Sequence, residues 1–549
     1  MFLRKLRPYL GILIAAIFGL ALTSCGGGLP ETEKAAREGI LLIGNGTEPK
    51  TLDPHLATGV PESSIMRALL EGLIATHPTN DLEPEPGMAE SWEHNEDFSI
   101  WTFHLRDALW SNGDPVLASD FVYSWQRILS PALGAEYAPM LYVIKNAEAF
   151  NIGEIEDFGQ VGVKALDDKT LQVTLQGSTP HFLSMIKHSS YSPVNPRAVE
   201  EHGGMTDRQS GWSTLENFAG NGPFRLKSWV TNQVIEVERN PHYWDAETVK
   251  LNGIRFYPID NANTEETMFR NDRLHLTNTV NPDKIAYFQE IMPDKLRISP
   301  YLGSYFYRLN VTREPLTDAR VRRALTLALD RQLLVERVTK GGQAPASGLV
   351  PQGIPGYGAS TTVQYDPEEA RRLLAEAGYP GGQGFPGVEI MINTSEAHRK
   401  IAEAIQALWR EELGITVGIY NQEWKVYLDS QSNLDYDIAR AGWIGDFVYP
   451  STFTDMFTTG NGNNDTGWSN PRYDALVARS RVAESEEERM VIFHEAEELL
   501  LEEMPIIPIY WYTRVLLQDP RVHGWYPKLL DAHHYKYVWL EPEGEAGGQ

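Results

Sequence analysis

Residues 388–419 read VEIMINTSEAHRKIAEAIQALWREELGITVGI, and this stretch decides the fold class. Val388 to Asn393 is a mostly apolar run typical of a buried strand, and Ile415 to Ile419 has the same character. Glu396 to Leu413, between them, has the periodicity of an amphipathic helix. Together they predict a β–α–β crossover within a parallel sheet that carries helices on its faces. Because ligands of such sheets bind at the carboxyl ends of the strands, we expect Asn393-Thr394-Ser395 to lie near a binding site.

Patterns elsewhere in the chain also alternate between strand and helix. Ser99 to Leu105 alternates polar residues with β-branched or aromatic ones, and Asn112-Gly113 after it is a turn pair. Thr317 or Asp318 can cap a helix that has apolar residues at i, i+3, i+4, i+7 and i+8. Asp366-Pro367 begins a further helix, which Gly378 ends. The chain is therefore predicted to be an α/β protein.

The chain shows no sign of separate domains joined by linkers. Its 549 residues correspond to two to four domains of ordinary size. Yet glycines and prolines are spread evenly, and we find no repeat. The low-complexity segments are confined to Gly26-Gly27-Gly28 and the tail Gly544 to Gln549. We therefore predict interlocked domains with several chain crossings.

Met1 to Cys25 has the pattern of a lipoprotein signal peptide. A basic head precedes the apolar run Leu10 to Leu22, which is too short to span a bilayer, and Leu22-Thr23-Ser24-Cys25 is a small-residue cleavage site. Cleavage would leave Cys25 at the amino end, where its thiol can carry lipid. The alternative is an uncleaved anchor helix, but the flexible Gly26-Gly27-Gly28 that follows favours a lipidated end. We expect an extracytoplasmic protein anchored through Cys25.

Composition excludes several classes of function. The formal net charge of −26 disfavours nucleic acid and anionic lipid as partners. Cys25 is the only cysteine, so a mature chain has no free thiol for a disulfide, for zinc ligation or for catalysis. The mature chain is large enough to form a core without disulfides.

The usual catalytic and cofactor motifs are absent or incomplete. There is no G-x-S-x-G and no Walker-type motif. Residues 382–387 match G-x-G-x-x-G, but they precede a strand and contain Pro386, so we interpret them as a loop. His494-Glu495-Ala496-Glu497-Glu498 lacks the second histidine of a zinc-protease helix, and we interpret it as a solvated helical face. We expect no enzymatic activity, no cofactor and no metal.

Arg440-Ala441-Gly442-Trp443-Ile444-Gly445-Asp446-Phe447 follows the expected strand Tyr436 to Ala439. Glycine allows a ligand backbone to approach closely, and an indole provides a flat wall. A carboxylate in a dry cleft is a good partner for an ammonium group. The alternative for Asp446 is a helix cap, which is the commoner role of an Asp after a strand.

Several stretches, in order along the chain, share their sequence with one protein family. They are Gly46-Thr47-Glu48-Pro49, Leu52-Asp53-Pro54-His55, Ala89-Glu90-Ser91-Trp92, 101–106, 120–127, 238–241 with Tyr243-Trp244, 421–425, Arg440-Ala441-Gly442-Trp443 and 505–510. Together these stretches closely resemble the oligopeptide-binding proteins of bacterial ABC importers, which form solute-binding family 5. The resemblance covers nearly the whole mature chain.

This resemblance implies a two-lobed periplasmic-binding-protein fold, class II-like, with an extra α+β domain inserted in the first lobe. Residues 1–24 would be the signal peptide and 25–39 a tether. The first lobe would comprise 40–70, 196–302 and 517–549, the extra domain 71–195, and the second lobe 303–516. The lobes would close on an extended peptide.

The resemblance also implies how a peptide is held at its amino end and along its backbone. Asp446 matches the acid that receives the α-ammonium group. Main-chain groups would pair with the ligand as in an added β-strand, which gives affinity without reading sequence. Roomy pockets, walled by aromatic residues, would take the side chains, although for Trp424 and Tyr137 ordinary core packing is the alternative. The matching backbone positions are Thr58, Gly59, Val60 and Gly442, and the pocket walls are Trp424, Trp443 and Tyr137.

At the carboxyl end, the resemblance implies a set of groups that sets peptide length. Arg440 matches the cation that faces shorter peptides, His188 and His398 match groups that face longer ones, and Arg313 stands where a lysine is expected. Gln431, at the pocket wall, replaces a second arginine, which argues against recognition of a murein peptide. Gly303 and Ile444 occupy the positions of a cysteine pair found in some members.

We therefore expect a non-catalytic lipoprotein, without cofactor, that captures short peptides and delivers them to an ABC permease as a monomer. An alternative is a receptor of the same fold for a special ligand, such as a murein tripeptide, a signalling peptide or a metal chelate. A secreted peptidase and an extracytoplasmic chaperone are alternatives from other classes.

Overall fold

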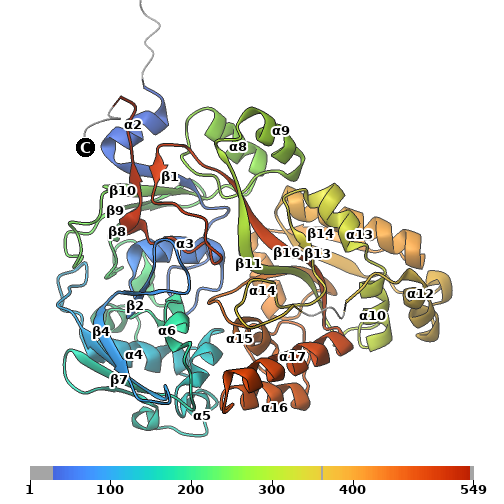
Figure 1. The fold of residues 1–549 in the computed structure, drawn as a ribbon, viewed down its shortest axis with the longest axis horizontal. Helices are drawn as coiled ribbons and strands as arrows, with labels where there is room; N and C mark the ends of the chain where they lie inside the picture. The colour runs from blue at the N-terminus through green and yellow to red at the C-terminus, as the bar shows by residue number, and fades with distance from the viewer. Residues whose placement is uncertain (1–28, 360–362, 545–549) are drawn as a thin grey trace, which may run out of the picture.

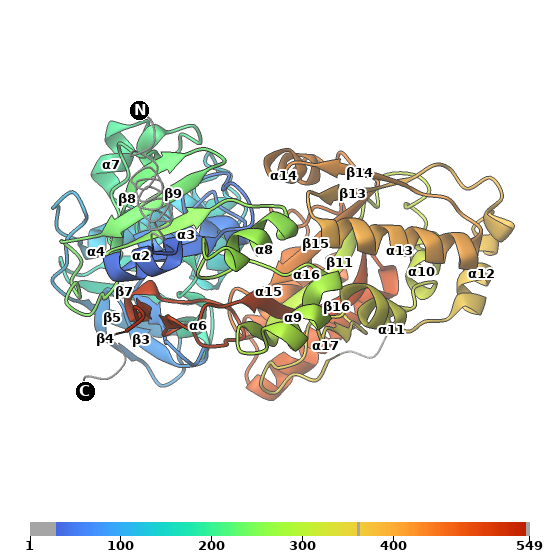
Figure 2. The same ribbon diagram turned by 90° about the horizontal axis from the view of Figure 1, so that it is seen from above.

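The computed structural model describes residues 29–359 and 363–544. Two lobes lie side by side, as Figures 1 and 2 show, which confirms the predicted two-lobed α/β fold. Every helix within these ranges is too short or too polar to span a lipid bilayer. The signal peptide and Cys25 lie outside the described residues.

The first lobe is built on a four-stranded sheet in which β1 runs parallel to β10 and the other pairs are antiparallel. Helix α3 (Val60–Leu69) buries Ile65 and Met66 in the same core as Phe224 of the sheet. In sheet order, the strands are β1 (Ile40–Gly44), β10 (Gly253–Tyr257), β9 (Val234–Arg239) and β8 (Phe224–Val230).

An extra domain adds a second, antiparallel sheet of four strands. The predicted strand and turn are confirmed as β5 (Ile100–Leu105) and a turn at Gly113, whose φ of 91° favours glycine. Helix α4 (Ala118–Leu129) buries Phe121 and Trp125 against this sheet. In sheet order, the strands are β4 (Ala89–His94), β5, β7 (Thr170–Thr174) and β6 (Val163–Ala165).

A buried ion pair joins the extra domain to the first lobe. Arg127 on α4 donates from Nη1 and Nη2 to the two carboxylate oxygens of Asp53, at 2.9 and 2.6 Å. Trp212 Nε1 donates to Asp53 Oδ2 at 3.0 Å. Both charged side chains are almost wholly buried, so the fork-to-fork geometry compensates for the water that they lose.

The second lobe contains a six-stranded mixed sheet and the predicted β–α–β unit. Strand β13 (Glu389–Asn393) pairs in parallel with β14 (Gly418–Gln422), and α13 (Glu396–Leu413) connects them. The helix begins where the Ser395 hydroxyl accepts from His398 N–H, and it ends at Gly414 with φ 70°. The sheet order is β12 (Ala344–Pro345), β16 (Ile506–Leu517), β11 (Leu296–Leu309), β15 (Ile438–Ile444), β13 and β14.

The two longest strands, β11 and β16, connect the lobes. They pair antiparallel from Leu296↔Leu517 to Arg308↔Ile506, with a register irregularity between Pro300 and Ser304. The predicted domain boundaries at 302/303 and 516/517 therefore fall inside β11 and β16, the first of them within the irregular stretch, which agrees with the absence of a linker in the sequence. Each of the three main sheets lies mostly within the residues of one predicted lobe or domain. The exact boundaries remain a prediction.

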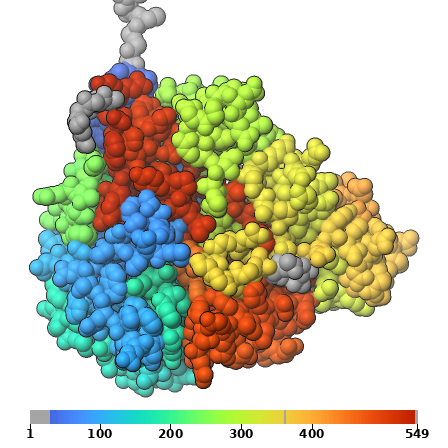
Figure 3. Space-filling view, in the orientation of Figure 1, coloured from blue at the N-terminus to red at the C-terminus, as the bar shows by residue number. Residues whose placement is uncertain are grey.

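Two sequence-based expectations are wrong. Residues 25–39 were expected to form a tether, but α2 (Glu31–Glu38) is a helix whose Glu33 is buried. The carboxylate of Glu33 accepts from Arg521 Nη1 at 3.2 Å and from Glu543 N–H at 3.0 Å, near the other end of the chain. In Figure 3 the C-terminal residues, in red, lie against the N-terminal ones, in blue.

The second correction concerns residues 494–498, on α17 (Glu486–Glu503): Glu495 and Glu498 are exposed as predicted, but Glu497 is not. Glu497 is fully buried, because its carboxylate accepts from the N–H groups of Leu349 and Val350 and from the Tyr357 hydroxyl. His494 stacks on the Tyr357 ring at 4.1 Å. The motif therefore anchors a loop of the second lobe.

The predicted caps at Asp318 and Asp366 are confirmed in helices α10 and α12, respectively. Residues 382–387 form the predicted loop. The remaining helices of the described ranges are α5 (Ala147–Asn151), α6 (Phe182–Met185), α7 (Pro196–Glu201), α8 (Ala262–Arg270), α9 (Ile285–Ile291), α10 (Ala319–Leu327), α11 (Arg331–Leu333), α12 (Pro367–Glu376), α14 (Trp424–Ser432), α15 (Ser451–Thr454) and α16 (Pro471–Ser480). The short strands there are β2 (Ile74–Thr76), β3 (Pro84–Pro86), β17 (Val522–His523) and β18 (Trp539–Leu540).

Candidate functional site

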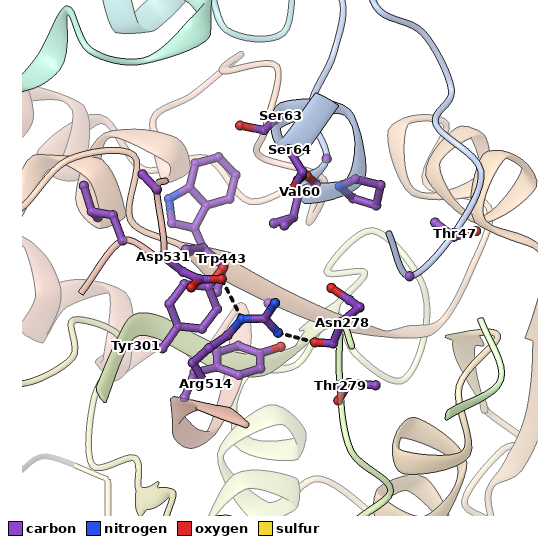
Figure 4. A pocket seen from close by; sticks show the side chains of 18 of the residues that line it. Thr47, Val60, Ser63, Ser64, Asn278, Thr279, Tyr301, Trp443, Arg514 and Asp531 are labelled. Atoms are coloured by element: carbon purple, nitrogen blue, oxygen red, sulfur yellow. Dashed lines mark hydrogen bonds and ion pairs between the residues drawn. The ribbon is translucent and has the colours of Figure 1, made fainter. Parts of the chain in front are cut away.

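A cavity of about 500 Å³ lies between the lobes. Its walls come from α3 of the first lobe, from the extra domain, and from β15 and β16 of the second lobe. In Figure 4, Val60, Ser63 and Ser64 project from α3 beside Trp443, and Tyr301 and Arg514 lie below them. Asn393, at the end of β13, lines the cavity as the crossover unit predicts.

Polar contacts between the lobes hold this cavity closed. Lys50 Nζ lies 2.7 Å from Asp429 Oδ1, and Asn261 Nδ2 donates to Glu396 Oε1 at 2.6 Å. The backbone N–H of Ala262 also donates to Glu396, at 3.2 Å. These contacts bridge the two lobes, and Glu396 and Ala262 also line the cavity.

Asp446 is a buried carboxylate in the wall of the cavity, two residues after β15 ends. Only 8% of its side chain is exposed. Thr452 Oγ1 donates to its Oδ2 at 3.1 Å, and Tyr137 Oη approaches Oδ1 at 3.4 Å. Burial raises the pKa of Asp446 to about 7, because these neutral donors only partly replace water. The carboxylate of Asp446 therefore has only neutral donors and can accept a further contact from a cation. It does not cap a helix.

His188 lies beside Asp446, with Nε2 3.3 Å from Oδ1. Burial lowers the pKa of His188 to about 3, so the imidazole is neutral and provides no counter-charge. The structure places His188 in contact with Asp446, and the assignment of His188 to the carboxyl end of longer peptides stays a prediction.

Arg440 is a buried cation held entirely by neutral groups. It donates from Nη2 to Tyr512 Oη at 2.7 Å and from Nη1 to Asn393 Oδ1 at 3.3 Å, and its guanidinium lies 4.9 Å from the Tyr305 ring centroid. Its buried Nε has no acceptor within the described residues. His398 lines the same region, and burial, together with the charge of Arg440, lowers its pKa well below the usual range. A carboxylate would complete this site.

Two glycines bring backbone to the cavity wall. A Cβ at Gly442 would lie 2.6 Å from Tyr512 Oη, and a Cβ at Gly59 would lie 3.0 Å from Trp424 Cζ2 of the other lobe. Thr58 and Val60 line the cavity on either side of Gly59. Side chains at either glycine would therefore push the walls apart.

The predicted aromatic walls also line the cavity. Tyr137 lies in the extra domain and Trp443 lies on β15 of the second lobe. Their rings stack beside Asp446, with centroids 6.0 Å apart. Trp424 stacks on Tyr427 at 5.7 Å, with its Nε1 buried and without an acceptor in the described chain.

Two predicted site residues do not line the cavity. Arg313 is 41% exposed and pairs with Asp435 at 3.1 Å and Asp437 at 3.5 Å, so it does not face a ligand carboxylate here. Gln431 is buried behind the wall, where its amide donates to Tyr427 Oη at 3.0 Å. It supports the wall and presents no group to the cavity.

Sequence reasoning missed other residues of the lining. Tyr512 lines the cavity and positions Arg440, Tyr305 contacts Arg440 from behind the lining, and Arg67 of α3 faces the cavity. Alternating tyrosines in a strand look like core residues, and a single arginine on a helix looks like a solvated one, so only the tertiary arrangement identifies them. Within residues 29–359 and 363–544, no three His, Cys, Asp or Glu side chains gather as metal ligands.

Comparisons with known proteins agree with this geometry. The family model "Bacterial extracellular solute-binding proteins, family 5 Middle" matches residues 83–465. The chain is 37% identical to the periplasmic oligopeptide-binding protein OppA of Salmonella typhimurium, over 96% of this chain and 97% of that protein. A crystal structure of Haemophilus influenzae OppA with the peptide RPPGFSPFR superposes with a TM-score of 0.87 at 35% identity, covering 92% of this chain and 99% of that one.

Two structures of a further relative indicate whether the lobes of this protein are open or closed. The murein tripeptide-binding protein MppA of Escherichia coli superposes with a TM-score of 0.86 at 34% identity, covering 91% and 98% of the two chains. An unliganded open form of MppA gives only 0.62, at similar coverage (92% and 98%) and 33% identity. The lower score and the contacts between the lobes indicate a closed conformation here. By the family model and by its identity with full-length relatives, this chain belongs to family 5 of the bacterial extracellular solute-binding proteins.

Proposed function

We propose that this protein captures short peptides outside the cytoplasmic membrane and delivers them to an ABC permease. One observation carries the proposal: the closed cavity contains a buried carboxylate, Asp446, and a buried guanidinium, Arg440. Neither has a charged partner of opposite sign within 4 Å in the described part of the chain, because His188 is neutral. A peptide zwitterion brings an ammonium for one and a carboxylate for the other.

The separation of the two groups fits a short peptide. Arg440 and Asp446 are six positions apart, which is at most about 20 Å of extended chain at 3.3 Å per residue, and the gap is shorter because β15 ends at Ile444 and the chain bends before Asp446. A peptide of three to five residues spans about 10–18 Å. Gly442 lies between the two groups and can present its backbone to the ligand, which supports binding that is largely independent of side chains.

The relatives support the same ligand class. The Salmonella protein is named for oligopeptides, and the Haemophilus structure contains a peptide. We propose further that the protein is a monomer, performs no chemistry on the peptide and is anchored by lipid on Cys25. Mass spectrometry of peptides incubated with the protein would then return them intact, whereas a peptidase would produce fragments.

The alternative is a receptor for one special ligand, as in the murein tripeptide-binding relative. Gln431 does not favour it, because this residue lies behind the cavity wall and adds no charge there. Competition between a murein tripeptide and generic tripeptides would separate the two functions. A chaperone would instead prefer long unfolded chains.

The experiment that tests the proposal is titration calorimetry of the protein lacking residues 1–25. Tri-, tetra- and pentapeptides would be compared with free and with acetylated amino ends. We expect tight binding that acetylation abolishes or weakens strongly. Absence of binding from a ligand-free sample, or equal affinity for both forms, would overturn the proposal.

A further inference from the structure

Arg67 is a cation in the cavity wall that a zwitterionic peptide leaves unmatched. Val60, Ser63, Ser64 and Arg67 follow helical spacing, and all of them line the cavity, three of them visible in Figure 4. Among the described residues, no hydrogen bond or ion pair engages the Arg67 side chain, which is half-buried. The face of α3 that carries the peptide-binding backbone at Val60 therefore ends in a free guanidinium.

Arg67 lines the same cavity as Asp446 and His188, which lie at the proposed amino end of the ligand, and as Tyr301 and His533. Its charge acts on Asp446 and on His188, the two groups in contact at that end. It does not form a salt bridge with Asp446, since their charged atoms lie more than 4 Å apart. About 10 Å of helix, at 1.5 Å per residue, separates Arg67 from Val60.

Three other acids of the cavity wall already have partners, and one of them, Glu71, lies 3.1 Å from His534 Nε2 and accepts from Trp244 Nε1 at 2.8 Å. Asp531 accepts from Arg514 Nε at 2.5 Å and lies 2.8 Å from His533 Nε2, and Asp81 lies 3.3 Å from Lys528 Nζ. Figure 4 shows the Arg514–Asp531 contact. These carboxylates therefore leave Arg67 without compensation.

Lys187 adds to the positive potential of the same wall. Its ammonium donates to the backbone carbonyl groups of Asp81 and Glu83, at 2.9 and 2.7 Å, so the contacts that hold it are neutral. The carboxylates of Asp81, Glu83 and Glu85 partly offset this charge, whereas Arg67 has no ion pair in the described part of the chain. A cation that is shielded from water attracts a carboxylate more strongly than one in solvent.

We propose that Arg67 gives this receptor a preference for peptides with a carboxylate side chain on the first or second residue. The inference rests on the proposed function and narrows its ligand class. The side-chain carboxylate forms a charge-assisted hydrogen bond with the guanidinium, while the α-ammonium group remains at Asp446. A basic side chain at these positions is repelled by Arg67 and Lys187.

Calorimetry with matched peptides tests this preference. Glu-Ala-Ala is compared with Gln-Ala-Ala, and Ala-Glu-Ala with Ala-Gln-Ala, so that each pair differs only in charge. For the unmodified protein we expect the Glu peptide of at least one pair to bind about tenfold more tightly, as for a hydrogen bond to a charged group. In Arg67→Met the ratio should fall to about one, and in Arg67→Lys it should be partly retained.

Arg410→Met is the matched control, because it removes the same charge from an exposed position on α13. It should leave the Glu/Gln ratio unchanged. Equal affinities within both pairs, or a preference that survives Arg67→Met, would overturn the inference and leave the proposed function intact. Failure of the unmodified protein to bind any peptide would overturn both.

Discussion

Asp446→Asn removes the charge of the proposed ammonium site and keeps its shape. A carboxylate and an ammonium about 3 Å apart interact by about 5–6 kcal/mol at an effective dielectric constant of 20. Part of this is offset because both groups lose water, and truncation of one partner of a buried charge pair costs about 2–5 kcal/mol. We therefore expect a loss of about 2–4 kcal/mol, which is about 30- to 1000-fold in Kd.

The assay is a double-mutant cycle by calorimetry, with trialanine and its N-acetyl form as the second change. Asp446→Asn should weaken binding of the free peptide by this factor and leave the weak binding of the acetylated one unchanged. Asp435→Asn, at a 77% exposed side chain, is the charge-matched control. If Asp446→Asn weakened both peptides equally, the ammonium would bind elsewhere and the reasoning would be refuted.

The raised pKa of Asp446 adds a pH dependence with a definite sign. In the closed, ligand-free protein Asp446 titrates at about 7, and a bound ammonium stabilises its ionised form, so the pKa falls on binding. Affinity should therefore decrease, by up to tenfold per unit, as the pH falls below 7. It should also decrease above about pH 8, where the α-ammonium group of the peptide loses its proton. His188, with a pKa of about 3, contributes nothing in this range. Titrations between pH 5.5 and 7 should show this slope, and Asp446→Asn should abolish it.

Three further changes test other parts of the structure. Gly442→Ala places a Cβ 2.6 Å from the Tyr512 hydroxyl, so peptide affinity should fall at least several-fold. Unchanged affinity would show that the cavity wall can move to accommodate the added methyl group. Arg127→Met leaves the Asp53 carboxylate buried and unpaired, and should lower the free energy of unfolding by about 3–5 kcal/mol in urea titrations; a loss below about 1 kcal/mol would contradict the structural role. Glu396→Ala removes the acceptor of two N–H groups on the other lobe. Small-angle scattering should then show a more open ligand-free protein, with an unchanged melting temperature. A variant as closed as the unmodified protein would show that this contact does not hold the lobes together.

The sequence predicted what depends on local pattern. The β13–α13–β14 unit follows from periodicity, because Ile401, Ile405 and Trp409 repeat at helical spacing and are buried. Glu497 shows where this reasoning ends, since its buried environment is formed by a tyrosine 140 residues earlier in the chain. His188 shows the same limit within the site. The family resemblance assigned His188 to the pocket, but it could not predict that the imidazole lies in contact with Asp446.

Comparison of Arg67 with Arg313 shows which part of the site the sequence could not predict. Both are single arginines without a surrounding motif, and the resemblance to the family selected Arg313. In the folded protein Arg313 is partly exposed and paired with Asp435, whereas Arg67 faces the cavity and has no hydrogen bond or ion pair within residues 29–359 and 363–544. The difference depends on which strands and loops pack around each side chain, and local sequence does not contain that information.

The burial of Glu33 has a consequence for the order in which the protein folds. Glu33 pairs with Arg37 in the same helix at 2.7 Å, but its other partners, Arg521 Nη1 and the N–H of Glu543, follow 488 and 510 residues later. An ionised carboxylate is costly to bury without its partners, so the environment of α2 is complete only when the last part of the chain is present. Completion of the first lobe is then a late step of maturation, and we expect a chain truncated before residue 517 to be open to quality-control proteases. The lipid that we propose on Cys25 would keep such an unfinished chain at the membrane surface.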